Sequence, residues 1–450
     1  MPFGGILVGI QMLGGPHACG FPRWIELDQR GSKRESGMHI LVVNSGSSSV
    51  KFSMFDSGGS ERLSRPVCLF DGQVSNIGEP SVTLDLSAAD GTNLRDGPSA
   101  VKAETPEEAM RLVLDAVCKP RIPIVEAVGY RVVHPGARLD QHQKITAKVL
   151  EDLEQAVAFA PLHDPAAIAV IREGMKRFPD VAHYACFDTV FHETMPAEAT
   201  TYPVPSIYRD KGVRRYGFHG LSCESVVQQI CAQMRTEGSE FPKRMVIAHL
   251  GSGCSVTALL DSRSVDTTMG LTPTGGVVME TRPGDLDPGL ILYLLRQQKT
   301  DCGKAASAVE TIMNHRSGMV ALAGMAGDIK ALRAAAEEGD KQATLALKIF
   351  TRSVTKAIGG FCWLLGGLDA IAFAGGVGEN DGVARAEILG DLKNLGIAIS
   401  TPLNLAKTHG IRRISEAESN TAVFVVPAQE DLMIAVHVDR MARSGGVVRK

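Results

Sequence analysis

One segment of this chain occurs twice, and the repetition limits the folds that the chain can adopt. Residues 39–54 read HILVVNSGSSSVKFSM and residues 245–260 read MVIAHLGSGCSVTALL, at a constant offset of 206 positions. In each copy an apolar run rich in β-branched residues leads into a Gly/Ser turn and a second apolar run, which is typical of a strand, a tight turn and a returning strand. A third strand that leads into a glycine turn is expected at residues 371–380, IAFAGGVGEN. The repeat predicts two related halves, each built on its own sheet.

The two repeated turns have a chemical interpretation as well as a structural one. A Gly/Ser turn at a strand end presents backbone N–H groups and small hydroxyls, which suit phosphate oxygens. An ordinary Gly/Ser hairpin has the same pattern, so one copy alone does not separate the two alternatives. Two copies facing each other across a cleft, with the glycine-rich third segment, would address the same nucleotide.

Composition and the lack of certain motifs exclude other classes of protein. The chain has 450 residues, enough for two or three domains, and its net charge of −3 gives no basic field for nucleic acid or an anionic membrane. No apolar run is long and uninterrupted enough to span a bilayer. Nine cysteines without a CxxC pair indicate reduced thiols in a cytoplasmic protein and no structural metal site. Neither GxGxxG after the first strand nor GxxxxGK[ST] occurs, which disfavours Rossmann and P-loop sites.

The order of predicted elements favours an α/β protein with two lobes. Residues 1–37 lack a sustained period and are expected to form a poorly ordered arm, so translation starting at Met38 is one hypothesis. A capping box at Thr105 and Glu108 opens a predicted helix. Further helices are predicted at residues 147–159, 164–178, 222–234 and 341–365 and from Glu430 onward, with strands at residues 124–133, 181–187 and 423–426. Asp164 is expected to cap the second of these helices, with Pro165 in its first turn.

Several of these segments together resemble acetate kinases. The motifs are NSGSSSVK (44–51), RVVH (131–134), APLH (160–163), FDT (187–189), RYGFHG (215–220), HLG (249–251), MGLTP (269–273), TR (281–282) and GVGEN (376–380). Their order and approximate spacing agree over residues 38–440, nearly the whole chain except the arm. Each motif alone is weak, but nine in register are specific.

The resemblance implies a duplicated, two-lobed actin-like (ribonuclease H-like) fold with a cleft between the lobes. It divides the chain into the arm at 1–37, an N-terminal lobe at 38–190 that is joined by a terminal helix at 430–450, and a C-terminal nucleotide-binding lobe at 191–429. The implied activity is reversible, direct in-line phosphoryl transfer between ATP and acetate, giving ADP and acetyl phosphate. Mg²⁺ or Mn²⁺ is the implied cofactor and ATP/ADP the co-substrate, and a cytoplasmic homodimer is the implied state.

The resemblance also implies roles for individual residues. Those with a catalytic role are Asp188, His219, Arg282 and His163. Those that bind the acyl substrate are Arg131, Val133, Leu162, Phe218 and Pro273. Those that line the nucleotide are Lys51, His249, Leu250, Gly251, Ser252, Gly253, Asp328, Ile329, Lys330, Gly376, Val377, Gly378, Glu379 and Asn380. Asn44 and Glu430 are the implied metal positions. Since acetate is ionised at neutral pH, Asp188 is expected to organise the metal or the arginines and not to act as a base.

The sequence departs from the family pattern at a few of these segments. Ser252 stands in place of asparagine, and Glu280 and Pro283 flank Arg282 where glycine and serine are usual. Two other functions therefore stay open: a propionate or butyrate kinase, and an actin-like nucleotide-binding sensor or scaffold that has lost phosphoryl transfer. The retained Arg131, Asp188 and His219 argue against the second of these.

Overall fold

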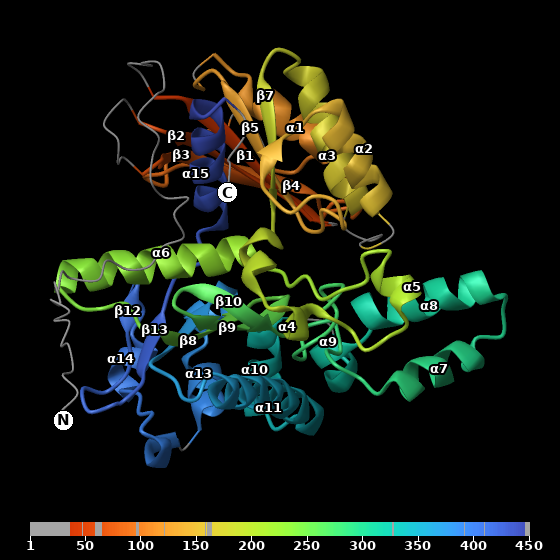
Figure 1. Cartoon of the computed structure of the whole chain (residues 1–450). Helices are drawn as coiled ribbons and strands as arrows, with labels where there is room; N and C mark the ends of the chain where they lie inside the picture. The colour runs from red at the N-terminus through yellow and green to blue at the C-terminus, as the bar shows by residue number, and fades with distance from the viewer. Residues whose placement is uncertain are drawn as a thin grey trace, which may run out of the picture.

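Two mixed β-sheets form the framework of this computed structural model, which describes residues 37–46, 48–58, 65–95, 99–120, 122–157, 159, 164–325, 328–390, 392–408 and 410–445 (Figure 1). In sheet order, the first sheet consists of β4 (Thr83–Ala88), β3 (Val67–Ser75), β2 (Ser49–Asp56), β1 (His39–Ser45), β5 (Ala127–Val132), β7 (Ala182–Phe187) and β6 (Gln143–Lys144). The second sheet consists of β10 (Arg263–Thr267), β9 (Cys254–Leu260), β8 (Arg244–Leu250), β11 (Ala370–Ala374), β13 (Ala422–Val425) and β12 (Arg412–Arg413).

The two sheets share one topology, which confirms the duplication predicted from the repeated segment. In the first sheet β1 pairs antiparallel with β2 and parallel with β5, and β5 pairs parallel with β7. In the second sheet β8 pairs in the same ways with β9 and β11, and β11 pairs with β13. The repeated segments are therefore the hairpins β1–β2 and β8–β9. The central strands are almost completely buried, as their uninterrupted apolar runs require.

Helices cover the sheets and separate the lobes. The first sheet is covered by α1 (Pro106–Val117), α2 (Ala147–Ala156) and α3 (Asp164–Arg177) on one face and by α15 (Glu430–Arg443) on the other. The remaining helices are η2 (Val190–Thr194), α4 (Ala197–Thr200), α5 (Ser206–Arg209), α6 (Gly220–Glu237), α7 (Pro288–Gln297), α8 (Cys302–His315), α9 (Gly318–Ala323), α10 (Ile329–Glu337), α11 (Lys341–Leu364), α12 (Gly375–Asn380), α13 (Gly382–Leu389), η3 (Leu392–Leu395) and α14 (Thr401–Leu405). Every described helix is too short or too polar to cross a membrane.

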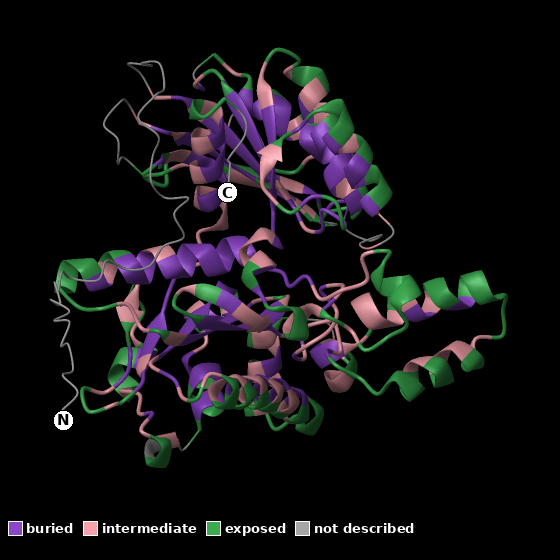
Figure 2. Ribbon diagram, viewed as in Figure 1, coloured by how far each residue is buried: buried purple, intermediate pink, exposed green. Residues whose placement is uncertain are grey.

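Helix α6 is the element that both lobes share. It runs between them in Figure 1 and is purple along most of its length in Figure 2. Leu221 packs with α15 and the first sheet, whereas Cys223, Val226 and Ile230 pack on the second sheet. Both α6 and α15 begin at the level of the cleft. The first residues of these helices are therefore placed where the lobes meet.

A local sequence signal accounts for the start of α1. The Thr105 hydroxyl accepts a hydrogen bond from the Glu108 N–H at 3.2 Å, as the capping box predicts. In a capping box the glutamate carboxylate accepts from the N–H of the N-cap residue, here Thr105. In this structure the Glu108 carboxylate accepts instead from the N–H of the preceding residue, Glu104.

Two local predictions need correction. Residues 375–380 form the short helix α12 directly after β11, and not a turn. Asp164 was expected to cap a helix, but it is the first residue of α3, where its side chain is buried. The predicted N-terminal arm, up to residue 36, lies outside the described residues.

Candidate functional site

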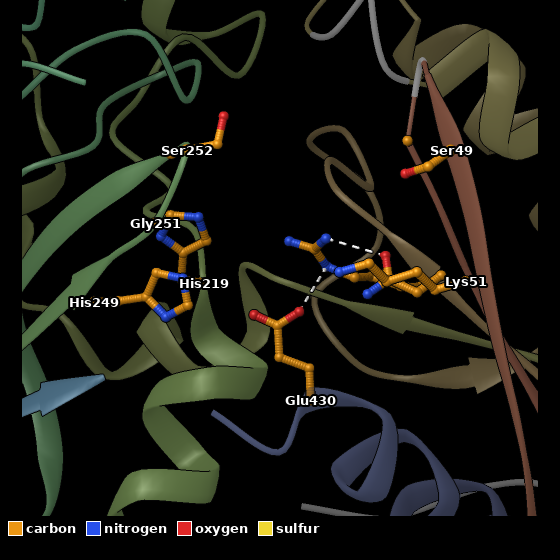
Figure 3. A pocket seen from close by; sticks show the side chains of 11 residues that line it. Ser49, Lys51, His219, His249, Gly251, Ser252 and Glu430 are labelled. Atoms are coloured by element: carbon orange, nitrogen blue, oxygen red, sulfur yellow. Dashed lines mark hydrogen bonds and ion pairs between the residues drawn. The ribbon is translucent and has the colours of Figure 1, made fainter. Parts of the chain in front are cut away.

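A cavity of about 290 Å³ lies between the two repeated hairpins and the start of α15 (Figure 3). The residues that line it are Asn44, Gly46, Ser49, Lys51, Arg131, His219, His249, Gly251, Ser252, Gly253 and Glu430. They come from β1, the β1–β2 turn, β2, β5, β8, the β8–β9 turn and the N-termini of α6 and α15. Two halves that the sequence separates by about 200 positions thus contribute opposite walls of one site.

Arg131 organises the N-terminal wall of this cavity. Its Nε and Nη2 donate to the two carboxylate oxygens of Asp188 at 2.9 and 2.5 Å, and its Nη1 donates to Asn44 Oδ1 at 3.2 Å. Glu430 Oε2 lies 3.7 Å from Arg131 Nε. Arg131 is on β5 and Asp188 directly follows the neighbouring parallel strand β7, so the carboxyl ends of adjacent strands bring the pair together.

Charge and burial decide the ionisation of these groups. Burial alone would lower the pKa of Arg131, but the carboxylates of Asp188 and Glu430 outweigh burial and raise that pKa. Burial raises the pKa of Asp188, and the Arg131 guanidinium opposes that rise through its charge and its two hydrogen bonds. For Glu430, burial works against ionisation, yet the charge of Arg131 prevails and lowers its pKa. The forked contact is therefore that of an ionised pair, with a second carboxylate beside it.

Two stacked imidazoles form the opposite wall. The rings of His219 and His249 lie 4.1 Å apart between centroids at an interplanar angle of 25°. Burial, then the His249 ring and the guanidinium groups of Arg131 and Arg282, hold the pKa of His219 well below its ordinary value. Burial also lowers the pKa of His249, against the opposing charge of Glu430. Both rings are thus neutral at physiological pH.

Backbone geometry fixes the position of His219. It is the N-cap of α6 in the left-handed region, with φ of 59°, a conformation that is unfavourable for a residue with a Cβ. The next residue, Gly220, donates its N–H to the Asp188 carbonyl at 2.8 Å, and a Cβ there would lie 2.2 Å from that oxygen. Only glycine allows α6 to begin against the end of β7, beside the Arg131–Asp188 pair.

Arg282 extends from a loop toward Gly253, which lines the cavity. Its Nη1 donates to the Pro273 carbonyl at 2.9 Å, and a Cβ on Gly253 would lie 3.6 Å from this atom and 3.4 Å from His219 Nε2. The loop is tied to α9 by the bond from Met319 N–H to the Met279 carbonyl, and to the β8–β9 turn by the bond from Glu280 N–H to the Ser252 carbonyl. Burial lowers the pKa of Arg282, although a guanidinium stays charged at neutral pH. Within the described residues no ion pair joins Glu280 to Arg282.

The other predicted site residues lie at varying distances from this cavity. Val133 and the buried Phe218 pack in one apolar cluster. The Leu250 side chain is in the core, and its carbonyl lies against Gly375. Glu379 Oε1 accepts from Ala428 N–H, which ties α12 to the approach to α15. His163 and Leu162 lie outside the described residues.

Among the residues predicted for the nucleotide, three groups differ in their contacts. Gly376 N lies 4.0 Å from the position of a Cβ on Gly251, so this end of α12 adjoins the cavity, while Val377, Gly378 and Asn380 continue the same short helix. Asp328 caps α10 by accepting from Ala331 N–H, and Ile329 and Lys330 begin that helix. Among the described residues, no hydrogen bond or ion pair links Asp328, Ile329 or Lys330 to the cavity lining.

Four residues of the site were not singled out by sequence reasoning. Gly46 and Ser49 line the cavity and belong to the Gly/Ser segment that was expected to suit phosphate, but they were not named individually. Ser255 Oγ lies 2.9 Å from His219 Nδ1, and Ser222 Oγ lies 2.7 Å from His249 Nδ1. Ser222 begins a predicted helix and Ser255 lies in the second repeated segment, but no spacing rule indicates that either hydroxyl would contact a histidine.

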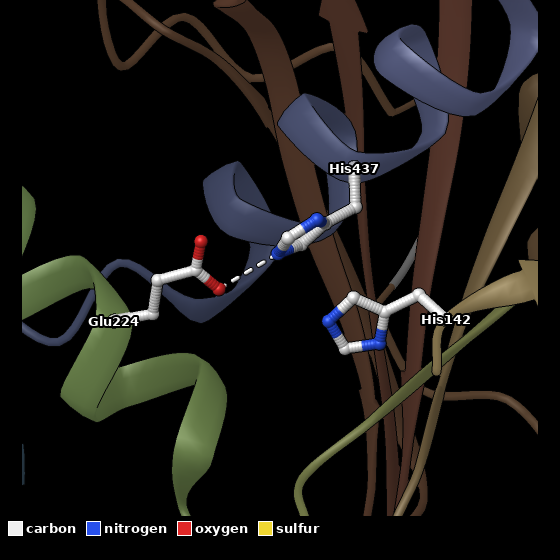
Figure 4. A group of neighbouring side chains, drawn as sticks. All are labelled: His142, Glu224 and His437. Carbon is white, nitrogen blue, oxygen red and sulfur yellow. Dashed lines mark hydrogen bonds and ion pairs between the residues drawn. The ribbon is translucent and has the colours of Figure 1, made fainter. Parts of the chain in front are cut away.

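A second group of ionisable side chains joins the lobes outside the cavity (Figure 4). His437 of α15 and Glu224 of α6 are 2.7 Å apart between Nε2 and Oε2, and the His142 ring lies 4.1 Å from the His437 ring. His142, Glu224 and His437 each offer a possible metal ligand, and the three ligand atoms lie within 4.8 Å of one another. However, His142 Nδ1 accepts the Phe187 N–H at 3.0 Å, which places the ring proton on Nε2, the nitrogen a metal would need. The group is therefore an ion pair between lobes with a neutral histidine beside it.

Fold and site together define the class. Two sheets of the same topology, with phosphate-type turns facing each other across a cavity lined by Arg131, two histidines and Glu430, form a two-lobed, actin-like phosphotransferase. The sequence profile of the acetokinase family matches residues 39–436. The chain belongs to the acetokinase family.

Individual relatives agree with this assignment. The chain is 35% identical over 416 residues to an acetate kinase of Halothermothrix orenii, covering 90% of this chain and 100% of the relative. It is 37% identical to an acetate kinase of Streptomyces coelicolor, over 91% and 98% of the two chains. Among solved structures, Porphyromonas gingivalis acetate kinase superposes with a TM-score of 0.77 at 30% identity, over 90% and 100% of the chains. A Francisella tularensis propionate kinase gives a TM-score of 0.79 at 31% identity, over 90% and 99%.

Proposed function

We propose that this protein is an acetate kinase, which transfers the terminal phosphoryl group of ATP directly to acetate and catalyses the reverse reaction. The observation that carries the proposal is the cavity itself. It places Arg131 and the neutral donors of His219 and His249 on opposite walls, with Arg282 Nη1 and His219 Nε2 both near Gly253. Phosphoryl transfer depends on positioning and on positive charge around the transferring group, and these residues supply both.

Each residue has a role that its surroundings support. Arg131 holds the carboxylate of the acyl substrate, and Asp188 orients the guanidinium by its two hydrogen bonds. Arg282 and His219 stabilise the equatorial oxygens of the transferring phosphoryl group. Because acetate is already ionised, no residue needs to remove a proton, and Asp188 has both oxygens occupied by Arg131. Lys51, which lines the cavity, and the turn at residues 251–253 hold the polyphosphate of the nucleotide.

A divalent metal ion, Mg²⁺ by its preference for oxygen ligands, fits this cavity. Asn44 presents an amide oxygen there, and the lowered pKa of Glu430 keeps a carboxylate ionised beside it. These two residues would hold the ion, directly or through its waters, and the bound ion would neutralise charge on the phosphates. The stacked histidines are not needed as ligands, since hard cations favour oxygen.

The acyl group would enter an apolar pocket next to Arg131. Val133 and Phe218 lie in one apolar cluster, and Pro273 is fixed through its carbonyl by Arg282. Side chains of this size suit a methyl group. One added methylene changes transition-state binding by about 1–3 kcal/mol, so propionate is the nearest competitor, and the similarity to a propionate kinase makes this the second candidate.

The test is an acyl-chain panel with ATP and Mg²⁺, in which acyl phosphate is trapped as its hydroxamate. We expect kcat/KM to be highest for acetate and to fall with propionate and butyrate. Equal or higher kcat/KM for propionate would assign a propionate kinase. ATP binding without product from any of the three acids would indicate a nucleotide sensor and contradict the proposal.

We further propose that the protein is a cytoplasmic homodimer, joined through the C-terminal lobe. Helix α7 has no buried residue, and its Leu292 and Tyr293 are 51% and 56% exposed to solvent. Near its end, α11 has two adjacent glycines, 359 and 360, with open space around them, and Trp363 is 89% exposed. Glycine inside a helix costs up to about 1 kcal/mol relative to alanine, which close approach of a partner helix would offset.

Light scattering after size-exclusion chromatography tests this arrangement. The wild type should elute with twice the mass of one chain, and Trp363→Glu or Leu292→Glu should yield monomer. An exposed polar position on the N-terminal lobe, Glu151→Lys, serves as the control and should stay dimeric. A monomeric wild type would contradict the proposal.

A further inference from the structure

Helix α6 and the β8–β9 hairpin exchange two histidine–serine hydrogen bonds. His219 and Ser222 belong to the start of α6, whereas His249 and Ser255 lie directly opposite each other in the β8–β9 register. Each histidine contacts the serine of the other element, at 2.9 Å for His219–Ser255 and at 2.7 Å for His249–Ser222. Both serines are completely buried. In the described part of the chain, each hydroxyl hydrogen bonds to its imidazole and to no other group.

The direction of these bonds follows from hydrogen-bond accounting. If the imidazole donated from Nδ1, the buried hydroxyl would keep a proton without an acceptor, which costs about 1–3 kcal/mol. If the hydroxyl donates, its proton is satisfied, and the ring proton must be on Nε2 because both rings are neutral. The second arrangement is favoured for both pairs.

A third pair elsewhere in the chain provides an internal reference. His192 Nδ1 lies 2.9 Å from the buried Ser264 Oγ, and its Nε2 lies 2.9 Å from the Phe218 carbonyl. A carbonyl can only accept, so Nε2 of His192 carries the proton and Ser264 donates to Nδ1. The same serine-to-Nδ1 arrangement is therefore fixed independently in this protein.

We propose that Ser255 and Ser222 are positioning residues that lock His219 and His249 in the Nε2–H tautomer. His219 Nε2 is then a neutral donor beside Gly253 and Arg282 Nη1, where the proposed function places the transferring phosphoryl group. Loss of the Ser255 hydroxyl frees the ring to place its proton on Nδ1, which leaves Nε2 as an acceptor facing phosphate oxygens. The catalytic consequence rests on the proposed function, whereas the tautomer does not.

Two measurements on the full-length protein test the proposal. With ¹⁵N-histidine labelling, long-range ¹H–¹⁵N spectra report the tautomer, and His219→Gln and His249→Gln assign the two rings. We expect the Nε2–H form for both rings in the wild type and an increased Nδ1–H fraction for His219 in Ser255→Ala.

In parallel, Ser255→Ala should lower kcat by about 10- to 100-fold with a small change in the KM for ATP, since a misoriented donor costs less than the 10²–10³-fold loss in kcat that follows deletion of a donor. Ser255→Thr, which keeps the hydroxyl, should restore both.

Ser264→Ala is the matched control, because the Phe218 carbonyl still holds the His192 proton on Nε2. It should keep the His192 tautomer and kcat. A wild type with the proton on Nδ1 of His219 would overturn the proposal, and so would Ser255→Ala with an unchanged tautomer, whatever its kcat. If the wild type forms no acyl phosphate while both rings are Nε2–H, the proposed function fails and the tautomer assignment stands.

Discussion

Arg131 and Asp188 form a forked ion pair at the carboxyl ends of two adjacent parallel strands. The Asp188 side chain is 1% exposed and that of Arg131 is 18% exposed. The guanidinium therefore lines the cavity, while the carboxylate that orients it is buried behind it. Gly220 donates its N–H to the Asp188 carbonyl, so the same residue that orients Arg131 also anchors the helix that carries His219. Asp188 therefore positions both walls of the site without lining the cavity itself.

Asp188→Asn should impair the use of acetate more than the use of ATP. The amide keeps the shape but removes the charge that holds Arg131, and breaking a buried pair costs about 3–5 kcal/mol. We expect a higher KM for acetate and a kcat lower by about 10²-fold, the size of effect seen when one positioned donor is lost. Steady-state kinetics with each substrate varied separately measure both values. An unchanged KM for acetate together with a lower kcat would instead assign Asp188 as a base.

Arg282→Ala should lower kcat far more than it weakens ATP binding. Its guanidinium lies next to His219 Nε2 at the glycine turn, where charge develops during transfer, so about 10²–10³-fold in kcat is expected. Arg282→Lys should recover little, because lysine lacks the planar fork that reaches two oxygens at once. Isothermal titration with ADP gives the binding affinity, and the hydroxamate assay gives kcat. Equal losses in both would make Arg282 a binding residue only.

The sequence was informative wherever chemistry is encoded locally. The repeat predicted both hairpins, whereas Arg131 and Asp188 were assigned to the site by the resemblance of their motifs to acetate kinases. Contacts between distant segments had no such signal. Asp188 was expected to organise the metal or the arginines, but the sequence did not single out Arg131, 57 positions away, as its partner. No sequence pattern indicates that Ser255 contacts His219.

The glycine run after β11 was misjudged for a related reason. Glycine is unfavourable in helices, yet residues 375–380 are helical because Gly375, at φ of 77°, starts the turn directly against Leu250. A Cβ there would lie 2.7 Å from the Leu250 carbonyl oxygen. Close approach of the backbone to β8 thus outweighs local propensity, and only the tertiary structure shows this.

Buried neutral histidines should make the protein sensitive to mild acid. Burial lowers the pKa of His134 and of His192 to about 4, and it also lowers the pKa values of His142, His183, His219 and His249. Above pH 6.5 these rings are neutral whether the chain is folded or unfolded. Below it the unfolded chain takes up protons that the folded chain cannot, so stability falls as the pH decreases from about 6.5 toward 4.

The size of this effect can be measured by urea unfolding at pH 7.5, 6.0 and 5.0. A shift from 6.5 to about 4 corresponds to about 3 kcal/mol for His192 over the full pH range. His192→Gln, whose amide nitrogen can take the place of His192 Nε2 as donor to the Phe218 carbonyl, should reduce the pH dependence. A free energy of unfolding that is constant from pH 7.5 to 5.0 would contradict the assignment of neutral rings.

The Glu224–His437 pair should contribute to the joining of the lobes and not to phosphate chemistry. Glu224 is one turn beyond His219 on α6, and His437 is two turns beyond Glu430 on α15, so the pair ties together the two helices whose first turns reach the cavity. Burial opposes the ionisation of Glu224, but the charge of His437 prevails and lowers the pKa of Glu224.

Glu224→Gln or His437→Asn alone leaves one buried group without its partner, at a cost of about 3 kcal/mol in stability. The double variant should cost less than the sum of the two, and urea unfolding of the four proteins at pH 7 gives the coupling energy. Additive losses would show that the contact carries no specific energy, and a rise in melting temperature with Zn²⁺ would reassign the group as a metal site.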